Sequence, residues 1–192
     1  MLKIAISGNI ASGKTAVEEI LTQKGFKVFD TDKLAHDILS ECKTIVIEEF
    51  QNFDIIEENE ISRRKLGNIV FKNKDLKNKL ENIVYPNLKK EIEEIFEQNQ
   101  KEKFVFISIP LLFEVGWEYL FDKILFIKTD DDIRLKRLIQ RNNLSADEAK
   151  IRMLSQMSQD AKIEKSDFII CNNGDIRNLQ KEIDEFIILL ED

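Results

Sequence analysis

The residue types and spacing that bind nucleotide phosphates occur in one segment near the N-terminus, GNIASGKT over residues 8–15. Its two glycines, Gly8 and Gly13, let the backbone turn tightly enough for several N–H groups to point inward at a phosphate. Lys14 can reach the outer phosphates, and the hydroxyl of Thr15 can bind Mg²⁺. The segment therefore predicts a binding site for a nucleoside triphosphate.

The elements on either side of this loop follow the order that its chemistry requires. Residues 2–7 are an apolar run typical of a buried strand, and the residues after Lys14 place Val17, Ile20 and Leu21 on one helix face. A helix that starts near Lys14 adds the positive end of its dipole to the site. This strand, loop and helix order favours a phosphate-binding loop over a glycine-rich turn without a ligand.

Four further apolar runs suit buried parallel strands, over residues 27–30, 104–109, 123–128 and 167–171. Helical patterns separate these runs, and the alternation predicts a doubly wound α/β fold. A long helical insertion is expected over residues 43–100, in which Pro86 should bend or break the second helix. Either a substrate-binding subdomain or a pair of helices that covers the sheet would explain this insertion.

Composition and charge narrow the class of protein. The 192 residues suit one domain with insertions, and 43% hydrophobic with 34% charged residues describe a soluble globular chain. The net charge of −7 argues against a nucleic-acid partner, because phosphate-backbone binding needs a basic face. No apolar run is long enough to span a bilayer and the chain starts with a strand, so neither a membrane partner nor a signal peptide is expected.

The two cysteines, Cys42 and Cys171, lie far apart in the sequence and lack the spacing of metal ligands. They are interpreted as reduced thiols, which predicts a cytoplasmic protein.

Two carboxylates follow the second predicted strand, in the sequence Asp30-Thr31-Asp32. Ligands of α/β folds bind at the carboxyl edge of the sheet, and residues two apart on an extended segment face the same side. Asp32 could therefore act as a general base or hold Mg²⁺. The alternative is that Asp32 is the N-cap of a helix over residues 33–39, and the two roles are not exclusive.

The third predicted strand and a later basic segment add further candidates. Ser108 stands near the end of that strand, where a phosphate-loop fold usually has an acidic residue, and serine is a poorer Mg²⁺ ligand than a carboxylate. The arginines at 134, 137 and 141 share one face of a predicted helix. This face is either solvated or closes over a triphosphate and neutralises its charge.

With these residues assembled, the chain resembles the dephospho-CoA kinase family over nearly its whole length. The phosphate-binding loop is widely shared, so the more particular motifs carry the resemblance. They are D-x-D at 30–32, P-L-L-F-E at 110–114, R-x-x-x-R at 137–141 and A-x-x-R-x-x-x-Q at 149–156. The resemblance implies transfer of the γ-phosphoryl group of ATP to the ribose 3′-hydroxyl of dephospho-CoA, with Mg²⁺.

The resemblance also implies roles for individual residues. The implied catalytic residues are Lys14, Asp32, Arg137 and Arg141. The residues implied to bind ATP are Gly8, Ala11, Ser12, Gly13, Lys14, Thr15, Ala16, Asn172 and Gly174. The residues implied to bind the acceptor are Asp32, Arg64, Tyr85, Leu112, Phe113 and Glu114. Thr15 is the implied Mg²⁺ ligand, with Asp32 joining through a water.

The family fold implies a five-stranded parallel sheet and three functional parts. These are a nucleotide-binding core over residues 1–42, 101–130 and 163–192, a CoA-binding insertion over 43–100, and a lid over 131–162. A monomer or a small homo-oligomer is expected. The alternative functions are another small-molecule kinase, of the nucleoside monophosphate or shikimate type, a nucleotide-binding switch and a nucleic-acid-dependent ATPase.

Overall fold

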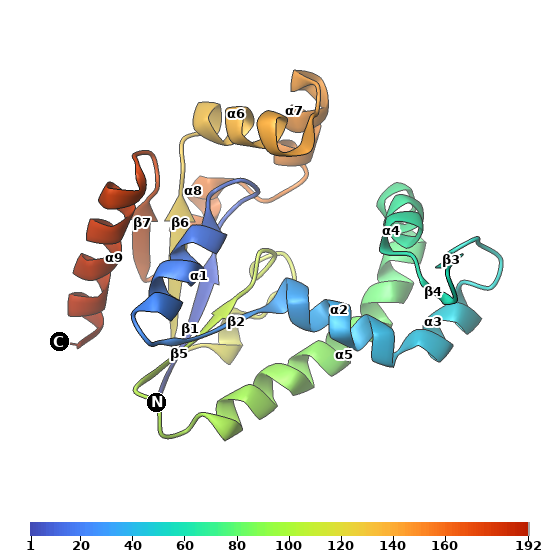
Figure 1. Ribbon diagram of the computed structural model, residues 1–192, viewed down its shortest axis with the longest axis horizontal. Coiled ribbons are helices and arrows are strands. Elements are labelled where there is room, and N and C mark those ends of the chain that lie inside the picture. The colour runs from blue at the N-terminus through green and yellow to red at the C-terminus, as the bar shows by residue number, and fades with distance from the viewer. Residues whose placement is uncertain (192) are drawn as a thin grey trace. The chain divides into compact units, whose positions relative to one another are not determined.

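The apolar runs of the sequence form a five-stranded parallel sheet in the order β2-β5-β1-β6-β7 (Figure 1). The strands are β1 (Leu2–Ser7), β2 (Lys27–Asp30), β5 (Phe104–Ser108), β6 (Lys123–Lys128) and β7 (Phe168–Cys171). The central strand β1 pairs with β5, where Ile6 is opposite Ser108, and with β6. The predicted doubly wound α/β fold is confirmed.

Two helices, α1 (Lys14–Gln23) and α9 (Ile176–Glu191), cover one face of this sheet (Figure 1). Every second strand residue lies beneath these helices, such as Ile4 and Ile6 on β1, because successive strand side chains point to opposite faces. Burial of each such side chain stabilises the fold by about 1.5–3 kcal/mol. The helices contribute Val17, Ile20, Leu21, Leu179, Ile183 and Phe186 to the core.

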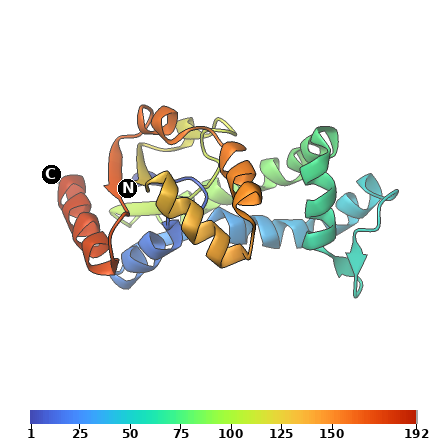
Figure 2. The same ribbon diagram turned by 90° about the horizontal axis from the view of Figure 1, so that it is seen from above.

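The segment expected to be helical after β6 consists of three helices, α6 (Asp131–Asn142), α7 (Ala146–Leu154) and α8 (Gln159–Ile163). Helix α6 ends because Asn143 adopts a left-handed conformation, with φ of 51°. Helix α7 begins with a capping box between Ser145 and Glu148. Helices α6 and α7 pack against each other, as the view from above shows (Figure 2).

The insertion contains α2 (Thr31–Glu41), α3 (Lys43–Glu49), α4 (Arg63–Lys72) and α5 (Lys74–Gln98), with α5 packed against the other three helices. It is not helical throughout, because the short strands β3 (Ile56–Glu57) and β4 (Glu60–Ile61) form a hairpin. The two turn residues, Glu58 and Asn59, both have positive φ, as a two-residue hairpin turn requires. A small apolar core of Val46, Phe50, Ile55 and Leu66 stabilises this part.

Of the two expectations for Pro86, a break in the second helix is wrong, because α5 runs without interruption from Lys74 to Gln98. A bend at Pro86 stays a prediction. A proline inside a helix removes one backbone hydrogen bond and costs about 3 kcal/mol. The buried face of α5, which includes Val84 and Leu88 on either side of Pro86, supplies packing that outweighs this cost.

The computed structural model describes residues 1–191, which divide into two compact units, one of residues 1–29 with 99–191 and one of residues 30–98. Helix α2 belongs to the second unit, although the sequence analysis grouped it with the core. The functional division into core, insertion and lid stays a prediction. Within residues 1–191, none of the helices is both long and apolar enough to cross a membrane.

Candidate active site

A backbone hydrogen bond and a glycine with positive φ shape the loop between β1 and α1. The N–H of Ser12 donates to the carbonyl oxygen of Asn9 at 3.0 Å, and Gly13, with φ of +90°, precedes the first turn of α1. The Nζ atom of Lys14 lies 3.3 Å from the carbonyl oxygen of Gly8. The predicted phosphate-binding residues therefore gather at the N-terminal end of α1, where the helix dipole favours an anion.

Asn172, which follows β7, packs directly against this loop. Its side-chain Nδ2 donates to the carbonyl oxygen of Ser12 at 2.8 Å, and the hydroxyl of Thr129 donates to the same oxygen at 2.9 Å. A Cβ atom added to Gly13 would lie 2.1 Å from Asn172 Nδ2. Position 13 therefore requires glycine, both for its conformation and for this close approach.

Gly174 lies two residues further along the same turn. A Cβ atom added there would lie 2.5 Å from Nδ2 of Asn178 in α9, so this position is also closely packed. Asn172 and Gly174, both predicted to bind ATP, thus belong to one turn that is packed against the loop and α9.

The guanidinium of Arg137 lies next to the phosphate loop. Its Nη2 donates to the carbonyl oxygen of Asn172 at 3.1 Å, and its Nη1 is 3.6 Å from where a Cβ atom on Gly13 would be. Within residues 1–191, this buried Nη1 and the buried hydroxyl of Ser12 have no hydrogen-bond partner. Such unsatisfied groups cost about 1–3 kcal/mol each, so the arrangement fits an anion that accepts from both.

The three arginines of α6 do not share one environment. Arg141 is exposed, and its Nε donates to the side-chain oxygen of Asn142 at 2.9 Å. Arg134 is buried, its Nε donates to the carbonyl oxygen of Ile10 at 3.0 Å, and its Nη1 pairs with Asp131 at 2.7 Å. Burial lowers the pKa of Arg134, against the raising effect of Asp131. Only Arg137 and Arg134 therefore contact the loop or its supports.

Gln156 is a supporting residue to which the sequence analysis gave no role. Its side-chain oxygen accepts from the backbone N–H of Ile10 at 2.7 Å, while the amide of Asn9 donates to the carbonyl oxygen of Met157 at 2.9 Å. The available signal was the position of Gln156 at the end of the A-x-x-R-x-x-x-Q motif. These bonds hold the outer part of the loop in place.

Candidate oxygen donors for Mg²⁺ lie on α1 and at the end of β5. Thr15 is exposed in the first turn, and the hydroxyl of Ser108 donates to Oε1 of Glu18 at 2.5 Å. In the described part of the chain, no cluster of three or more His, Cys, Asp or Glu side chains could hold a metal ion. Mg²⁺ in kinases keeps several waters and binds through one or two protein groups and the substrate phosphates, so this donor set fits the ion.

The structure corrects the interpretation of Asp30 and Asp32. Helix α2 starts at Thr31, and the carboxylate of Asp30 caps it by accepting from the N–H of Asp32 at 2.9 Å. The N-cap role considered for Asp32 is therefore wrong. The two acids do not share an extended segment either, because Asp32 already lies in the first turn of the helix.

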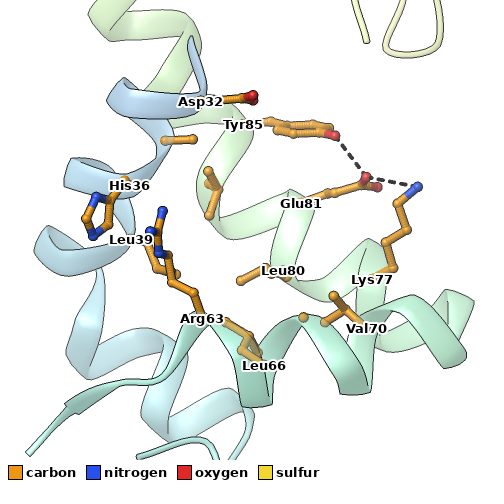
Figure 3. Close-up of a pocket in the computed structure, with 13 residues that line it drawn as sticks. Asp32, His36, Leu39, Arg63, Leu66, Val70, Lys77, Leu80, Glu81 and Tyr85 are labelled. Carbon is orange, nitrogen blue, oxygen red and sulfur yellow. Dashed lines mark hydrogen bonds and ion pairs between the residues drawn. The ribbon is translucent and has the colours of Figure 1, made fainter. Parts of the chain in front are cut away.

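Asp32 lines a cavity of about 320 Å³ within the second unit (Figure 3). Helices α2, α4 and α5 supply its walls, which are mainly apolar and include Leu39, Leu66 and Leu80. The polar lining includes a connected group in α5, in which Tyr85 donates to Glu81 at 2.8 Å and Lys77 lies 3.6 Å from the same carboxylate. The remaining lining residues are Ala35, His36, Arg63, Gly67, Val70 and Val84.

The predicted acceptor residues fall in three places. Asp32 and Tyr85 line the cavity, whereas Arg64 is exposed on α4 with its Nη2 3.8 Å from Glu57. Its neighbour Arg63 lines the cavity and was not predicted. Because these two arginines are adjacent on a helix, their side chains point about 100° apart, and the motif alone does not say which faces a ligand.

The other predicted acceptor residues, Leu112, Phe113 and Glu114, lie in the first unit. Leu112 and Phe113 are buried. Oε1 of Glu114 lies 2.7 Å from Nζ of the wholly buried Lys162 and accepts from the N–H of Met157 at 3.1 Å. In this structure Glu114 thus connects the segment after β5 both to α8 and to the segment that precedes α8.

Comparison with known proteins identifies relatives of this arrangement. Residues 2–178 match the family model described as dephospho-CoA kinase. A dephospho-CoA kinase from Fusobacterium nucleatum is 38% identical over 186 residues, which cover 95% of both chains.

Solved structures agree with the sequence matches. A dephospho-CoA kinase from Campylobacter jejuni is 36% identical, with a TM-score of 0.76 over 97% of this chain and 95% of that one. A protein from Thermus thermophilus is 28% identical, with a TM-score of 0.88 over 98% of this chain and 97% of that one. The likeness therefore extends over nearly the entire length of each chain.

Proposed function

The chain belongs to the dephospho-CoA kinase family, and we propose how its own residues carry out the ATP-dependent phosphorylation of dephospho-CoA, with the ribose 3′-hydroxyl as acceptor. The predicted family, kinase activity and reaction are confirmed by the family match and the relatives. The roles of single residues are our proposals, and they are supported by the contacts described above.

The loop after β1 binds the triphosphate of ATP. Its inward N–H groups and the dipole of α1 hold the phosphates, and Lys14 exchanges its bond to Gly8 for the outer phosphates. Arg137 supplies the buried N–H that needs an acceptor. Arg141, exposed on the same helix, adds a second cation that neutralises charge developing in the transition state.

The cavity of the second unit binds the acceptor. Dephospho-CoA carries a long arm of alkyl and amide groups, which matches apolar walls with a few polar groups such as Arg63 and Tyr85. Asp32 lines this cavity, and Asp30 rather than Asp32 caps α2. We assign to Asp32 the roles of orienting the acceptor hydroxyl and taking its proton.

The transfer forms one P–O bond, breaks another and moves one proton. The 3′-oxygen bonds to the γ-phosphorus as the bond from that phosphorus to the bridging oxygen breaks, ADP leaves, and the hydroxyl proton passes to Asp32. When bound, Mg²⁺ neutralises charge on the phosphate oxygens, and Thr15 is the loop residue that would hold it. A cytoplasmic location, a small-molecule partner alone and a monomeric or small oligomeric state complete the proposal.

The observation that carries the nucleotide site is the pair of buried, unsatisfied donors on Arg137 and Ser12 beside Gly13. The test is ADP release by the purified protein with ATP and, in turn, dephospho-CoA, AMP, CMP and shikimate. We expect turnover with dephospho-CoA and little with the others, and loss of turnover by orders of magnitude in Lys14→Ala. Equal turnover with AMP, or ATP hydrolysis independent of any acceptor, would contradict the proposal.

A further inference from the structure

Strand β5, which precedes the P-L-L-F-E motif at 110–114, ends without a carboxylate. In phosphate-loop enzymes the Mg²⁺ of the nucleotide is held by the loop hydroxyl and by an acidic residue from a neighbouring strand. Here β5 ends at Ser108, which is wholly buried and opposite Ile6 of β1, the strand that leads into the loop. A neutral hydroxyl cannot supply the negative charge that Mg²⁺ favours.

A carboxylate nevertheless reaches the end of β5, from the neighbouring helix. Glu18 of α1 is half-buried, and its Oε1 accepts the proton of the Ser108 hydroxyl at 2.5 Å. Glu18 follows Lys14 by four residues and Thr15 by three, so it lies on the same helix face as both. Helical side chains lean toward the N-terminus of their helix, which directs this carboxylate toward the loop.

We propose that Glu18, positioned by Ser108, supplies the protein carboxylate for the Mg²⁺ of bound ATP, an inference that rests on the proposed kinase function. The charge that other phosphate loops receive from a strand is provided here by α1. An ionised carboxylate has about four acceptor sites, so the bond from Ser108 fixes its rotamer and leaves it able to bind the metal or a metal-bound water. Ser108 is then a positioning residue, and Glu18 is the group that contacts the metal or a metal-bound water.

The decisive experiment measures metal binding rather than turnover. Mn²⁺, as a paramagnetic substitute for Mg²⁺, is titrated by electron paramagnetic resonance into protein saturated with a non-hydrolysable ATP analogue. We expect Glu18→Gln to raise the Kd of Mn²⁺ about tenfold or more, while binding of the metal-free nucleotide is not weakened. The matched control is Glu19→Gln, an exposed acid one residue along the same helix, which should leave both constants unchanged.

Two outcomes would overturn the inference. One is a Glu18→Gln protein with the wild-type Kd for Mn²⁺. The other is an equal weakening of metal-free and metal-bound nucleotide, which a merely structural role would produce. If wild-type protein itself fails to bind the nucleotide with Mn²⁺, the proposed function fails instead, so the two failures can be told apart.

The positioning role of Ser108 has its own test in the same assay. Ser108→Ala should raise the Kd of Mn²⁺ less than Glu18→Gln does, and it should add nothing in the Glu18→Gln background. Moving the carboxylate, in the double variant Glu18→Ser with Ser108→Asp, should restore metal affinity relative to Glu18→Ser alone. Independent, additive effects of Ser108→Ala and Glu18→Gln would contradict the coupling.

Discussion

The carboxylate of Asp30 accepts a hydrogen bond from the backbone N–H of Asp32 at 2.9 Å and caps α2. This relationship separates two acids that are almost adjacent in the sequence. Asp30 stabilises the helix, while Asp32 extends from the first turn into the lining of the cavity that we propose for the acceptor. Substitutions at the two positions should therefore have different effects.

Asp32→Asn should lower kcat by about 10²- to 10⁴-fold, because the amide cannot take the hydroxyl proton. It should leave ATP binding and the unfolding free energy close to wild type. Asp30→Ala should instead cost about 1 kcal/mol of stability, the usual effect of losing a cap. Steady-state kinetics and urea unfolding measure both effects, and near wild-type turnover of Asp32→Asn would remove its catalytic role.

Gly13→Ala should prevent tight nucleotide binding. The new Cβ would lie 2.1 Å from Asn172 Nδ2, and the residue would have to keep φ of +90°. The loop must shift, and we expect the Kd of ATP to rise by tenfold or more, which is about 1.4 kcal/mol. Gly25→Ala is the matched control, since Gly25 has φ of +91° with no atom within 4 Å of the added Cβ. It should cost only about 1–2 kcal/mol of stability and leave ATP binding unchanged.

The ion pair between the wholly buried Lys162 and the partly exposed Glu114 should make stability depend on pH. Burial lowers the pKa of Lys162 below 10.5, against the raising effect of Glu114. The unfolded chain therefore holds this proton more tightly than the folded chain does. Between the lowered pKa and 10.5, the contribution of Lys162 to the free energy of unfolding consequently rises with pH.

Urea unfolding of wild type and Lys162→Met at several pH values across this range tests that sign. The variant should lose about 1 kcal/mol at neutral pH, because the partly exposed Glu114 loses its partner, and the advantage of wild type should grow with pH. Lys90→Met is the control, since a hydrogen bond from exposed Lys90 to Glu94 raises the pKa of Lys90. The contribution of Lys90 to the free energy of unfolding therefore falls as pH rises, whereas that of Lys162 rises. A wild-type advantage that shrinks with pH would contradict the assignment for Lys162.

Gly67→Phe should block the acceptor cavity. Gly67 lies in α4 and lines the cavity, and an added Cβ meets no atom within 4 Å, so a larger side chain can enter the open space. The KM for dephospho-CoA should rise about tenfold or more, or about 1.4 kcal/mol, with the KM for ATP unchanged. Gly67→Ala should stabilise the helix by about 0.4–1 kcal/mol and retain both KM values. Unchanged KM values in Gly67→Phe would place the acceptor elsewhere.

Local signals made much of the fold predictable. The strands, the loop and α1 depend on runs of apolar residues and on glycines within a few positions of one another, and these appear where the sequence indicated. Pro86 shows where a local rule loses to tertiary packing, since the buried face of α5 keeps the helix intact. The hairpin turn at Glu58 and Asn59 lacks the glycine that usually signals such a turn, so no local pattern indicated it.

The site was less predictable, because its contacts join distant segments. Arg137 beside Gly13, and Ser108 beside Glu18, are brought together only by the order of the strands in the sheet. In the sequence by itself, Glu18 cannot be told from an ordinary acidic residue on a helix surface. The choice between Arg63 and Arg64 depends on the helical phase of α4, which a motif match does not provide.

The identity of the product is the most direct test of the central claim. Phosphorus-31 NMR of the purified protein with Mg²⁺, ATP and dephospho-CoA should show ADP and one new phosphomonoester on the ribose 3′-oxygen, in equal amounts. ADP with inorganic phosphate and unchanged dephospho-CoA, or a phosphate on another hydroxyl, would contradict the account.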